Sequence, residues 1–153
     1  MAVVTTYGAT LLSLKYRGQE MTLNWDNLED LVNKDKNPKY GATCGRVAGR
    51  ISKAKFEING EQFELEANNG PNCLHGGSEG FDNRVWKAKQ CQKMIELSPG
   101  KISNLPGIEF KRVSPHMECG FPGEITVYSY YLLSAQNQLV MKWEATMQDE
   151  QGT

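Results

Sequence analysis

Residues 56–65 constrain the fold most strongly, because apolar and polar side chains alternate on both sides of an Asn-Gly pair. Residues 56–58 read Phe-Glu-Ile and residues 61–65 read Glu-Gln-Phe-Glu-Leu, with Asn59 and Gly60 between them. A period of two is typical of strands. Asn-Gly suits a two-residue turn in which both residues need positive φ. The segment therefore predicts an antiparallel hairpin.

A second hairpin is predicted near the end of the chain. Residues 125–133 are rich in β-branched and aromatic residues, and a polar turn at residues 135–138 follows them. From Leu139 to Thr146 the pattern again has period two. One face of this strand holds the apolar residues Leu139, Met141, Trp143 and Ala145, and the other face holds Lys142, Glu144 and Thr146.

Helical signals are confined to residues 27–32, which can supply barely two turns, with Asp26 or Asn27 as the N-cap. The chain has 153 residues, of which 39% are hydrophobic, enough for one packed domain. We therefore expect an all-β protein, an antiparallel β-sandwich with at most one short loop helix, formed by a single partial domain over residues 1–153.

Charge and cysteine usage exclude several classes of partner. The net charge is -1 and the pI is near 6.1, and no run of Lys and Arg is interleaved with aromatic residues, so nucleic acid is not an expected partner.

The start carries no signal-peptide pattern and no apolar run approaches membrane-spanning length. The four cysteines are widely spaced without Cys-x-x-Cys, which predicts free thiols, no metal, and the cytoplasm as the compartment.

Glycine-flanked loops in the first half of the chain carry the site signal. Residues 45–51 read Gly-Arg-Val-Ala-Gly-Arg-Ile, residues 68–77 read Asn-Asn-Gly-Pro-Asn-Cys-Leu-His-Gly-Gly, and residues 80–82 read Gly-Phe-Asp. Glycine permits positive φ and the close approach of other groups, so Arg50 and His75 are expected at the rim of a cleft rather than in a core.

These segments resemble the aldose 1-epimerase (galactose mutarotase) family, and the resemblance runs through nearly the whole chain. It rests on five segments in the family's order: residues 7–11, residues 27–30, residues 45–51, residues 68–82 together with Trp86, and the Gly-Phe-Pro-Gly turn at residues 120–123. The resemblance implies an antiparallel β-sandwich of the mutarotase type, of which this chain is the N-terminal half.

What the resemblance implies for function is the interconversion of α and β anomers of free hexoses without a metal or cofactor. In the family a glutamate base takes the proton of the anomeric hydroxyl, and a histidine acid protonates the ring oxygen. An arginine and a second histidine bind the sugar. These two map onto Arg50 and His75, where His75 is an auxiliary group, and Asn72 is a weaker candidate for substrate binding.

The chemistry of the side chains supports the same pair. A guanidinium offers a rigid fan of donors to sugar hydroxyls, and a neutral imidazole can donate at one nitrogen and accept at the other. The alternatives are a solvated or salt-bridged surface role for Arg50, a backbone-bonded turn role for His75, and a turn cap for Asn72.

Other residues near the motifs are expected to be structural. Arg46 should hold a loop through carbonyl or carboxylate contacts, and His116 should be a surface turn residue. Phe81, Trp86 and Trp143 could stack on a sugar, but aromatic residues in alternating strands are more often core residues.

The chain also departs from the family pattern. Gly49 stands where the family signature has an asparagine, so a side-chain amide expected near the sugar is absent. The first strand, the acid histidine and the base glutamate have no counterpart among these residues, which predicts that the isolated chain is inactive.

Three functions remain open: an epimerase module complemented by a missing C-terminal half, a non-catalytic structural or interaction subunit, and a carbohydrate-binding module. An apolar edge from Leu139 to Thr146 also predicts a protein partner that covers it.

Overall fold

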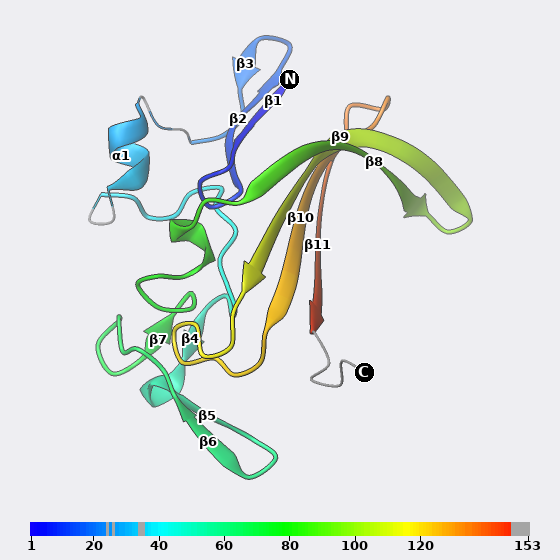
Figure 1. Ribbon diagram of the computed structural model, residues 1–153. Helices are drawn as coiled ribbons and strands as arrows, with labels where there is room; N and C mark the ends of the chain where they lie inside the picture. Colours follow the sequence, from blue (N-terminus) through cyan, green and yellow to red (C-terminus); the bar gives the residue numbers. More distant parts are fainter. Residues whose placement is uncertain (24, 26, 34–35, 148–153) are drawn as a thin grey trace. The chain divides into compact units, whose positions relative to one another are not determined.

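The computed structural model describes residues 1–23, 25, 27–33 and 36–147, and its regular secondary structure is almost entirely antiparallel strand (Figure 1). The chain divides into two compact units. The first unit comprises Met1–Val85 and His116–Pro122, and the second comprises Trp86–Pro115 and Gly123–Thr153. The expected all-β class with one short helix is confirmed.

The first unit is formed by short strands joined by long loops. Three small antiparallel sheets occur in it: β1 (Ala2–Thr5), β2 (Thr10–Tyr16) and β3 (Gln19–Glu20); β4 (Arg50–Ile51) with β7 (Cys73–Leu74); and β5 (Lys55–Ile58) with β6 (Glu61–Glu64). The last pair is the predicted hairpin. Its turn has positive φ at both Asn59 (52°) and Gly60 (85°), as the Asn-Gly signal requires.

Among the described residues one α-helix occurs, α1 (Leu28–Val32), in a loop of the first unit. Asn27 is its N-cap, and the Asn27 side chain accepts a hydrogen bond from the Asp30 N–H at 2.8 Å. Asp26, the other candidate for the cap, lies outside the described residues. Short 3-10 turns follow at η1 (Ser52–Ala54) and η2 (Phe81–Asn83). No helix in the described part of the chain is long and apolar enough to span a membrane.

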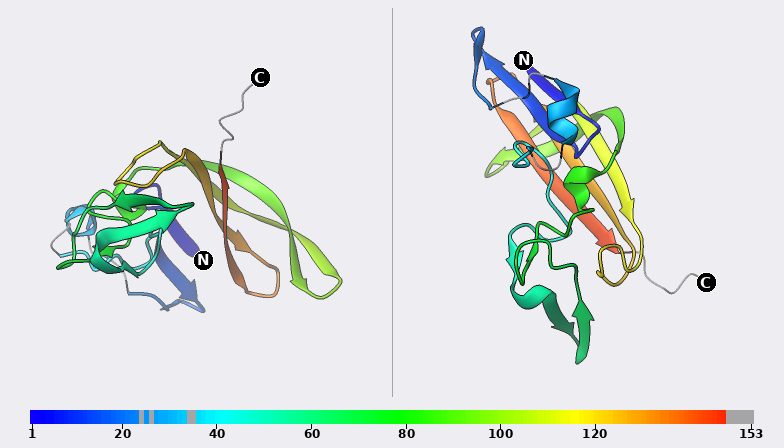
Figure 2. Two further views of the ribbon diagram at one scale, coloured as in Figure 1. Left: turned by 90° about the horizontal axis from the view of Figure 1, so that it is seen from below. Right: turned by 90° about the vertical axis from the view of Figure 1, so that its left-hand side faces the viewer.

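The second unit is one four-stranded antiparallel sheet of order β11-β10-β9-β8. Its strands are β8 (Lys87–Ser98), β9 (Lys101–Ser114), β10 (Ile125–Leu133) and β11 (Leu139–Met147). The β10–β11 hairpin confirms the sequence prediction. The longer β8–β9 hairpin, which curves away at its tip (Figures 1 and 2), was not predicted. The Pro99-Gly100 pair at its turn was the available sequence signal, and Gly100 has a φ of 76°.

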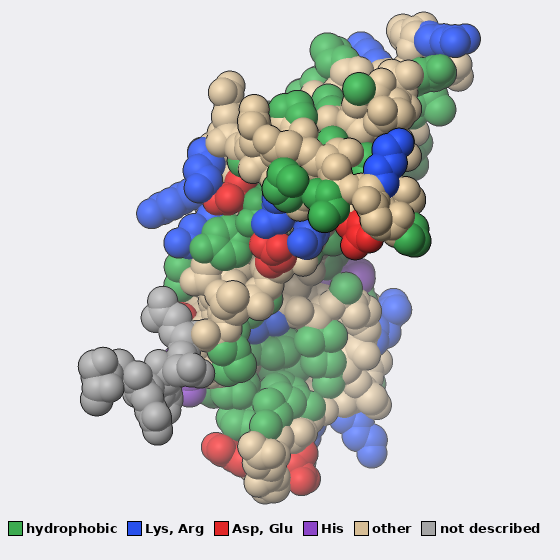
Figure 3. All heavy atoms as spheres, turned by 90° about the vertical axis from the view of Figure 1, so that its right-hand side faces the viewer, with side chains coloured by type: hydrophobic (Ala, Val, Ile, Leu, Met, Phe, Trp, Pro, Cys, Tyr) green, Lys and Arg blue, Asp and Glu red, His purple; other side chains and the backbone are tan. Residues whose placement is uncertain are grey.

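One face of this sheet carries a small hydrophobic core beside a charged cluster. Leu105, Tyr130 and Leu132 are buried and pack together. The Lys93 Nζ lies 3.9 Å from the centroid of the Tyr130 ring and 2.9 Å from the Glu144 carboxylate. Basic and acidic side chains both occur on the side of the chain shown in Figure 3, which agrees with the near-neutral net charge.

The expected core positions of the aromatic residues are confirmed for Phe81 and Trp86, which are 4% and 2% exposed. The prediction is wrong for Trp143, which is 51% exposed. Trp143 shares one face of β11 with Met141 and Met147, which are 46% and 67% exposed. The reason is positional: β11 is the outermost strand of its sheet, so a period-two apolar pattern does not by itself ensure burial.

Candidate functional site

The two-stranded sheet β4–β7 brings the predicted pair of sugar-binding residues together. Arg50 lies opposite Leu74 in this sheet, and His75 follows directly after β7. The His75 N–H donates to the Gly49 carbonyl at 2.9 Å. Residues 25 positions apart in the sequence therefore occupy neighbouring backbone positions.

His75 is held as a neutral imidazole with a defined tautomer. Its Nδ1 accepts a hydrogen bond from the Gly49 N–H at 3.0 Å, so the ring proton lies on Nε2. Burial, and then the Lys39 ammonium, lower the pKa of His75 below its ordinary value. The backbone φ of His75 is 53°, in the sparsely populated left-handed region that is more frequent at functional sites. The acceptor nitrogen is therefore used internally, which leaves a donor at Nε2.

Gly49 has a structural role of its own. Its φ is 91°, which disfavours residues with a Cβ, and its N–H fixes the His75 ring. A Cβ built at Gly49 would meet no atom within 4 Å. The departure from the family's asparagine therefore removes a side-chain amide while keeping the backbone donor that orients the imidazole.

Arg50 lies on the surface but is anchored at one end. Its Nε donates to Asn69 Oδ1 at 2.9 Å, and within the described part of the chain its side chain makes this one hydrogen bond. A salt bridge, one of the alternatives for Arg50, is not observed among those residues. The anchor constrains the guanidinium plane and leaves the two Nη groups to act as donors.

Asn72 serves the loop. Its Oδ1 accepts from the Lys53 N–H at 3.1 Å, across nineteen residues of sequence. The Asn72 side-chain oxygen therefore already has a partner within the protein, and this partner is neither a sugar nor the backbone of its own turn. The turn at residues 69–72 is closed by two backbone hydrogen bonds of 3.1 Å between Asn69 and Asn72.

The motif holds a further structural residue that sequence analysis did not single out. Asn68 binds both polar backbone groups of Leu74: the Leu74 N–H donates to Asn68 Oδ1 at 2.7 Å, and Asn68 Nδ2 donates to the Leu74 carbonyl at 3.0 Å. Asn68 thereby fixes the residue immediately before His75. Its position at the start of the motif at residues 68–77 was the sequence signal that could have identified it.

The structural roles expected for Arg46 and His116 agree with the structure. Arg46 Nη1 donates to the Pro122 carbonyl at 2.7 Å, and its guanidinium lies 6.0 Å from the centroid of the Phe121 ring. His116 is exposed in the turn after β9. Arg46 thus holds the loop through its contacts with Pro122 and Phe121, whereas Arg50 is exposed to solvent.

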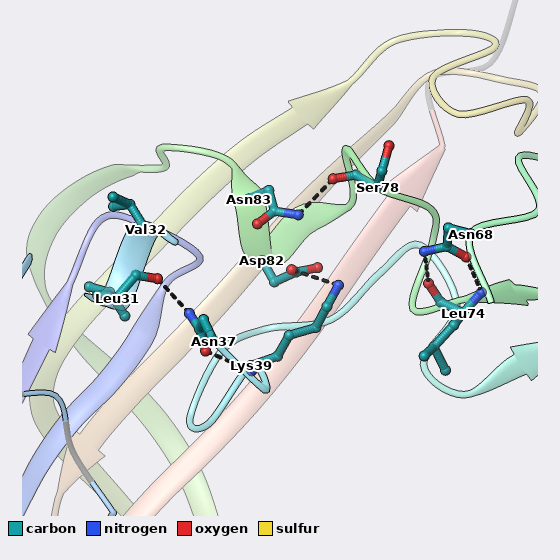
Figure 4. Close-up of a pocket in the computed structure, with 9 residues that line it drawn as sticks. All are labelled: Leu31, Val32, Asn37, Lys39, Asn68, Leu74, Ser78, Asp82 and Asn83. Carbon is teal, nitrogen blue, oxygen red and sulfur yellow. Dashed lines mark hydrogen bonds and ion pairs between the residues drawn. The ribbon is translucent and has the colours of Figure 1, made fainter. Parts of the chain in front are cut away.

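A buried ion pair lies in the same loop system. Lys39 Nζ is 2.8 Å from Asp82 Oδ2, and the Asp82 side chain is 3% exposed. The two charges act on His75 in opposite directions, since Lys39 lowers its pKa and Asp82 raises it. Asp82 belongs to the Gly-Phe-Asp motif, but no pattern in the sequence marked Lys39 as its partner. A pocket of about 410 Å³ opens beside the pair (Figure 4).

Comparisons with known proteins identify the family of this chain. The sequence profile of the aldose 1-epimerase family matches residues 1–153. The chain belongs to the aldose 1-epimerase family. It is 38% identical to galactose mutarotase of Bos taurus over 147 residues, covering 93% of this chain and 38% of the bovine protein. It is 33% identical to maltose epimerase of Levilactobacillus brevis, covering 93% of this chain and 40% of that protein.

Solved structures of the family show the same fold. The structure of galactose 1-epimerase from Lactobacillus acidophilus superposes with a TM-score of 0.81 at 27% identity, over 95% of this chain and 40% of that one. An aldose epimerase homologue from C. elegans gives a TM-score of 0.77 at 28% identity, over 96% and 42%. The mutarotase-like β-sandwich class is therefore confirmed, and the chain spans about 40% of the length of these relatives.

Proposed function

We propose that this chain supplies the sugar-binding part of an aldose 1-epimerase site. In this proposal the Nη groups of Arg50 and the Nε2–H of His75 donate to hydroxyls of a free hexose. The observation that carries it is the Gly49 N–H to His75 Nδ1 hydrogen bond, because it presets the imidazole as a neutral donor before any sugar arrives. A preset donor loses little entropy when the ligand binds.

We further propose that catalysis requires groups beyond these 153 residues. The chain holds two histidines, His75 and His116. His75 has a lowered pKa and an occupied Nδ1, so it is poorly suited to protonate a ring oxygen. His116 is an exposed turn residue. A complementing segment would therefore bring the acid and the base to the sugar.

A non-catalytic interaction subunit is the second candidate, and it rests on the exposed apolar side chains and the outermost position of β11. Met141 and Met147 are exposed on the outermost strand of the sheet. Such an edge can accept a further strand from another polypeptide segment. A strand that pairs with β11 could come from the complementing segment of the first candidate or from the structural partner of the second.

Sugar titration and polarimetry together test the proposal. The chain alone should bind D-galactose or D-glucose weakly, and it should not accelerate the equilibration of α-D-galactose beyond the buffer rate. His75→Ala should abolish binding, whereas the matched control His116→Ala should leave binding unchanged. Acceleration by the chain alone would show that no complementing segment is required. Equal binding by the wild-type chain and His75→Ala would disprove the role of His75.

The compartment is also a proposal. The four cysteines, Cys44, Cys73, Cys91 and Cys119, are all free thiols. Burial is the first cause that raises the pKa of each, which keeps the thiols protonated and less reactive. Free thiols suit a reducing compartment, and we propose the cytoplasm.

A further inference from the structure

The side chains of β11 form a charge pattern that is complementary to itself. β11 has nine residues and is the last strand in the sheet order, so within the described part of the chain only one of its edges is hydrogen-bonded to another strand, β10. The backbone N–H and C=O groups along the other edge can hydrogen-bond to an added strand. The side chains of β11 decide which strand fits there.

Trp143 is the middle residue of β11, and its position sets the register of a symmetric pairing. When two copies of β11 lie antiparallel with Trp143 opposite Trp143, all nine residues of each strand have a partner. In that register Lys142 of each copy lies opposite Glu144 of the other copy, on the same face of the joined sheet. The greatest overlap and the pairing of opposite charges therefore coincide in one register.

The neighbouring symmetric registers are unfavourable. Centring the pairing one residue earlier puts Lys142 opposite Lys142, and centring it one residue later puts Glu144 opposite Glu144. Like charges directly opposite each other in an antiparallel pair are destabilising. The two charged residues therefore select the register centred on Trp143.

The charged groups are already positioned beside this edge. Glu144 Oε2 is 2.9 Å from Lys93 Nζ, and Glu144 Oε1 is 2.8 Å from Lys142 Nζ. Lys93 holds the carboxylate in place, whereas Lys142, with a side chain 44% exposed, can exchange its own Glu144 for that of a second copy. Pairing therefore leaves no charge of this cluster without an opposite charge beside it.

The other face of β11 adds apolar contact. Met141, Trp143 and Met147 are exposed on that face. In the register centred on Trp143, the two tryptophans lie opposite each other and Met141 lies opposite Ala145. Contact between these side chains removes apolar surface from water, which favours association.

The outermost strand on the other side of the sheet, β8, has a different charge pattern. It carries Lys87, Lys89 and Lys93 with one acidic residue, Glu96. An excess of lysine is typical of edges that are protected from pairing. We propose that this chain forms a twofold-symmetric dimer in which the β11 strands of two copies pair antiparallel about Trp143 and join the two four-stranded sheets into one.

Analytical ultracentrifugation of the whole chain over a range of concentrations tests this proposal. The mass should rise from 17.1 kDa to twice that value and then stop, because a twofold interface is closed. Lys142→Glu and Glu144→Lys should each weaken dimerisation at least about tenfold in dissociation constant, because each places like charges opposite one another. Lys87→Glu, the matched charge control on β8, should leave the constant unchanged.

Mixing the two reversed variants gives the most specific measurement. The Lys142→Glu chain and the Glu144→Lys chain are complementary to each other but not to themselves, so an equimolar mixture should recover the dimer. Both reversals in one chain should also restore it. Failure of the folded variants to recover the dimer would overturn the proposal. So would a wild-type chain that stays at 17.1 kDa up to about 1 mM, or a mass that grows beyond the dimer.

The outcomes are separate from those of the proposed hexose site. The proposal assigns a second copy of the chain to the β11 edge, which the interaction-subunit candidate leaves to an unspecified partner, and it does not depend on hexose binding. His75→Ala should leave dimerisation unchanged, and Lys142→Glu should leave hexose binding unchanged. Loss of hexose binding with an intact dimer would overturn only the sugar-binding role, and hexose binding by a chain that never dimerises would overturn only the dimer.

Discussion

The two units of the chain are stabilised by different interactions. The second unit consists of four long strands, and its core of Leu105, Tyr130 and Leu132 sits on one face of a continuous sheet. The first unit has short strands, and its loops are held by side chain to backbone hydrogen bonds such as those of Asn68 and Asn72. Regular sheet gives a scaffold, whereas specific loop contacts place individual side chains for binding.

Backbone conformation shows the same contrast. Around the candidate site, His75, Gly76 and Gly77 have φ of 53°, 85° and 98° in succession. Left-handed backbone at a residue with a side chain costs free energy that other contacts must offset. The loops of the first unit should therefore tolerate substitution at glycine poorly, and the sheet of the second unit should be sensitive instead to loss of buried apolar volume.

The largest effect is expected from Leu132→Ala in the second unit. Leu132 is 0% exposed, so truncation leaves a cavity and should lower the free energy of unfolding by about 2–5 kcal/mol. Urea denaturation measures the loss, and hydrogen exchange of β9 and β10 amides localises it. The control Leu133→Ala, at a position 41% exposed, should cost much less. Equal losses in the two variants would contradict the assigned core.

Gly76→Ala should have the next largest effect, in the first unit. A Cβ at Gly76 would overlap the Gly45 carbonyl, and the φ of 85° adds strain. We expect a loss of about 2–4 kcal/mol from overpacking and backbone strain, together with loss of hexose binding.

Gly70→Ala is the matched control for Gly76→Ala. Gly70 has a φ of 58° with nothing within 4 Å of a built Cβ, so only strain applies and the loss should be smaller. Urea denaturation of both variants measures the difference. If Gly70→Ala were as costly as Gly76→Ala, close approach at Gly76 would not be the cause.

A smaller effect is expected at the charged cluster of the second unit. Hydrogen bonds from Lys142 and then Lys93 lower the pKa of Glu144 to about 2. A lowered carboxylate pKa stabilises the folded state above the ordinary value of 4.5, and this stabilisation is lost as the pH falls toward about 2. Glu144→Gln should lower the free energy of unfolding at pH 7 by about 0.5–1 kcal/mol, because the side chain is 35% exposed.

Denaturation at several pH values measures this effect. In Glu144→Gln the acid-dependent part of the stability should shrink between pH 4.5 and about 2. An unchanged pH profile would mean that Glu144 is not linked to folding.

The smallest expected effect is the pH dependence of His75 in the first unit. Its pKa is lower in the folded chain than the ordinary 6.5, so the unfolded chain binds more protons just below pH 6.5. The free energy of unfolding should fall as the pH decreases from 6.5 toward the folded pKa. Protonation at Nδ1 also displaces the Gly49 hydrogen bond, so hexose binding should weaken over the same range. His75→Gln should remove this pH dependence, and a measured His75 pKa above 6.5 would contradict it.

The sequence determined much of this protein by local rules. Asn59-Gly60 and its alternating flanks fixed a hairpin because both turn residues adopt positive φ. The glycine-rich motifs identified the family, and Arg46 holds its loop through the Pro122 carbonyl, as expected for a structural residue. These features depend on residues close together in the chain, or on patterns that the family shares.

Tertiary structure decided what depends on distant partners. Trp143 followed the same alternating pattern as a core strand, but its position on the outermost strand left it exposed. The Lys39–Asp82 pair joins residues 43 positions apart, and the Gly49 N–H selects the His75 tautomer from 26 positions away. Local propensity carries no information about which distant group will satisfy a buried charge or a ring nitrogen, because that choice is made only when the loops pack together.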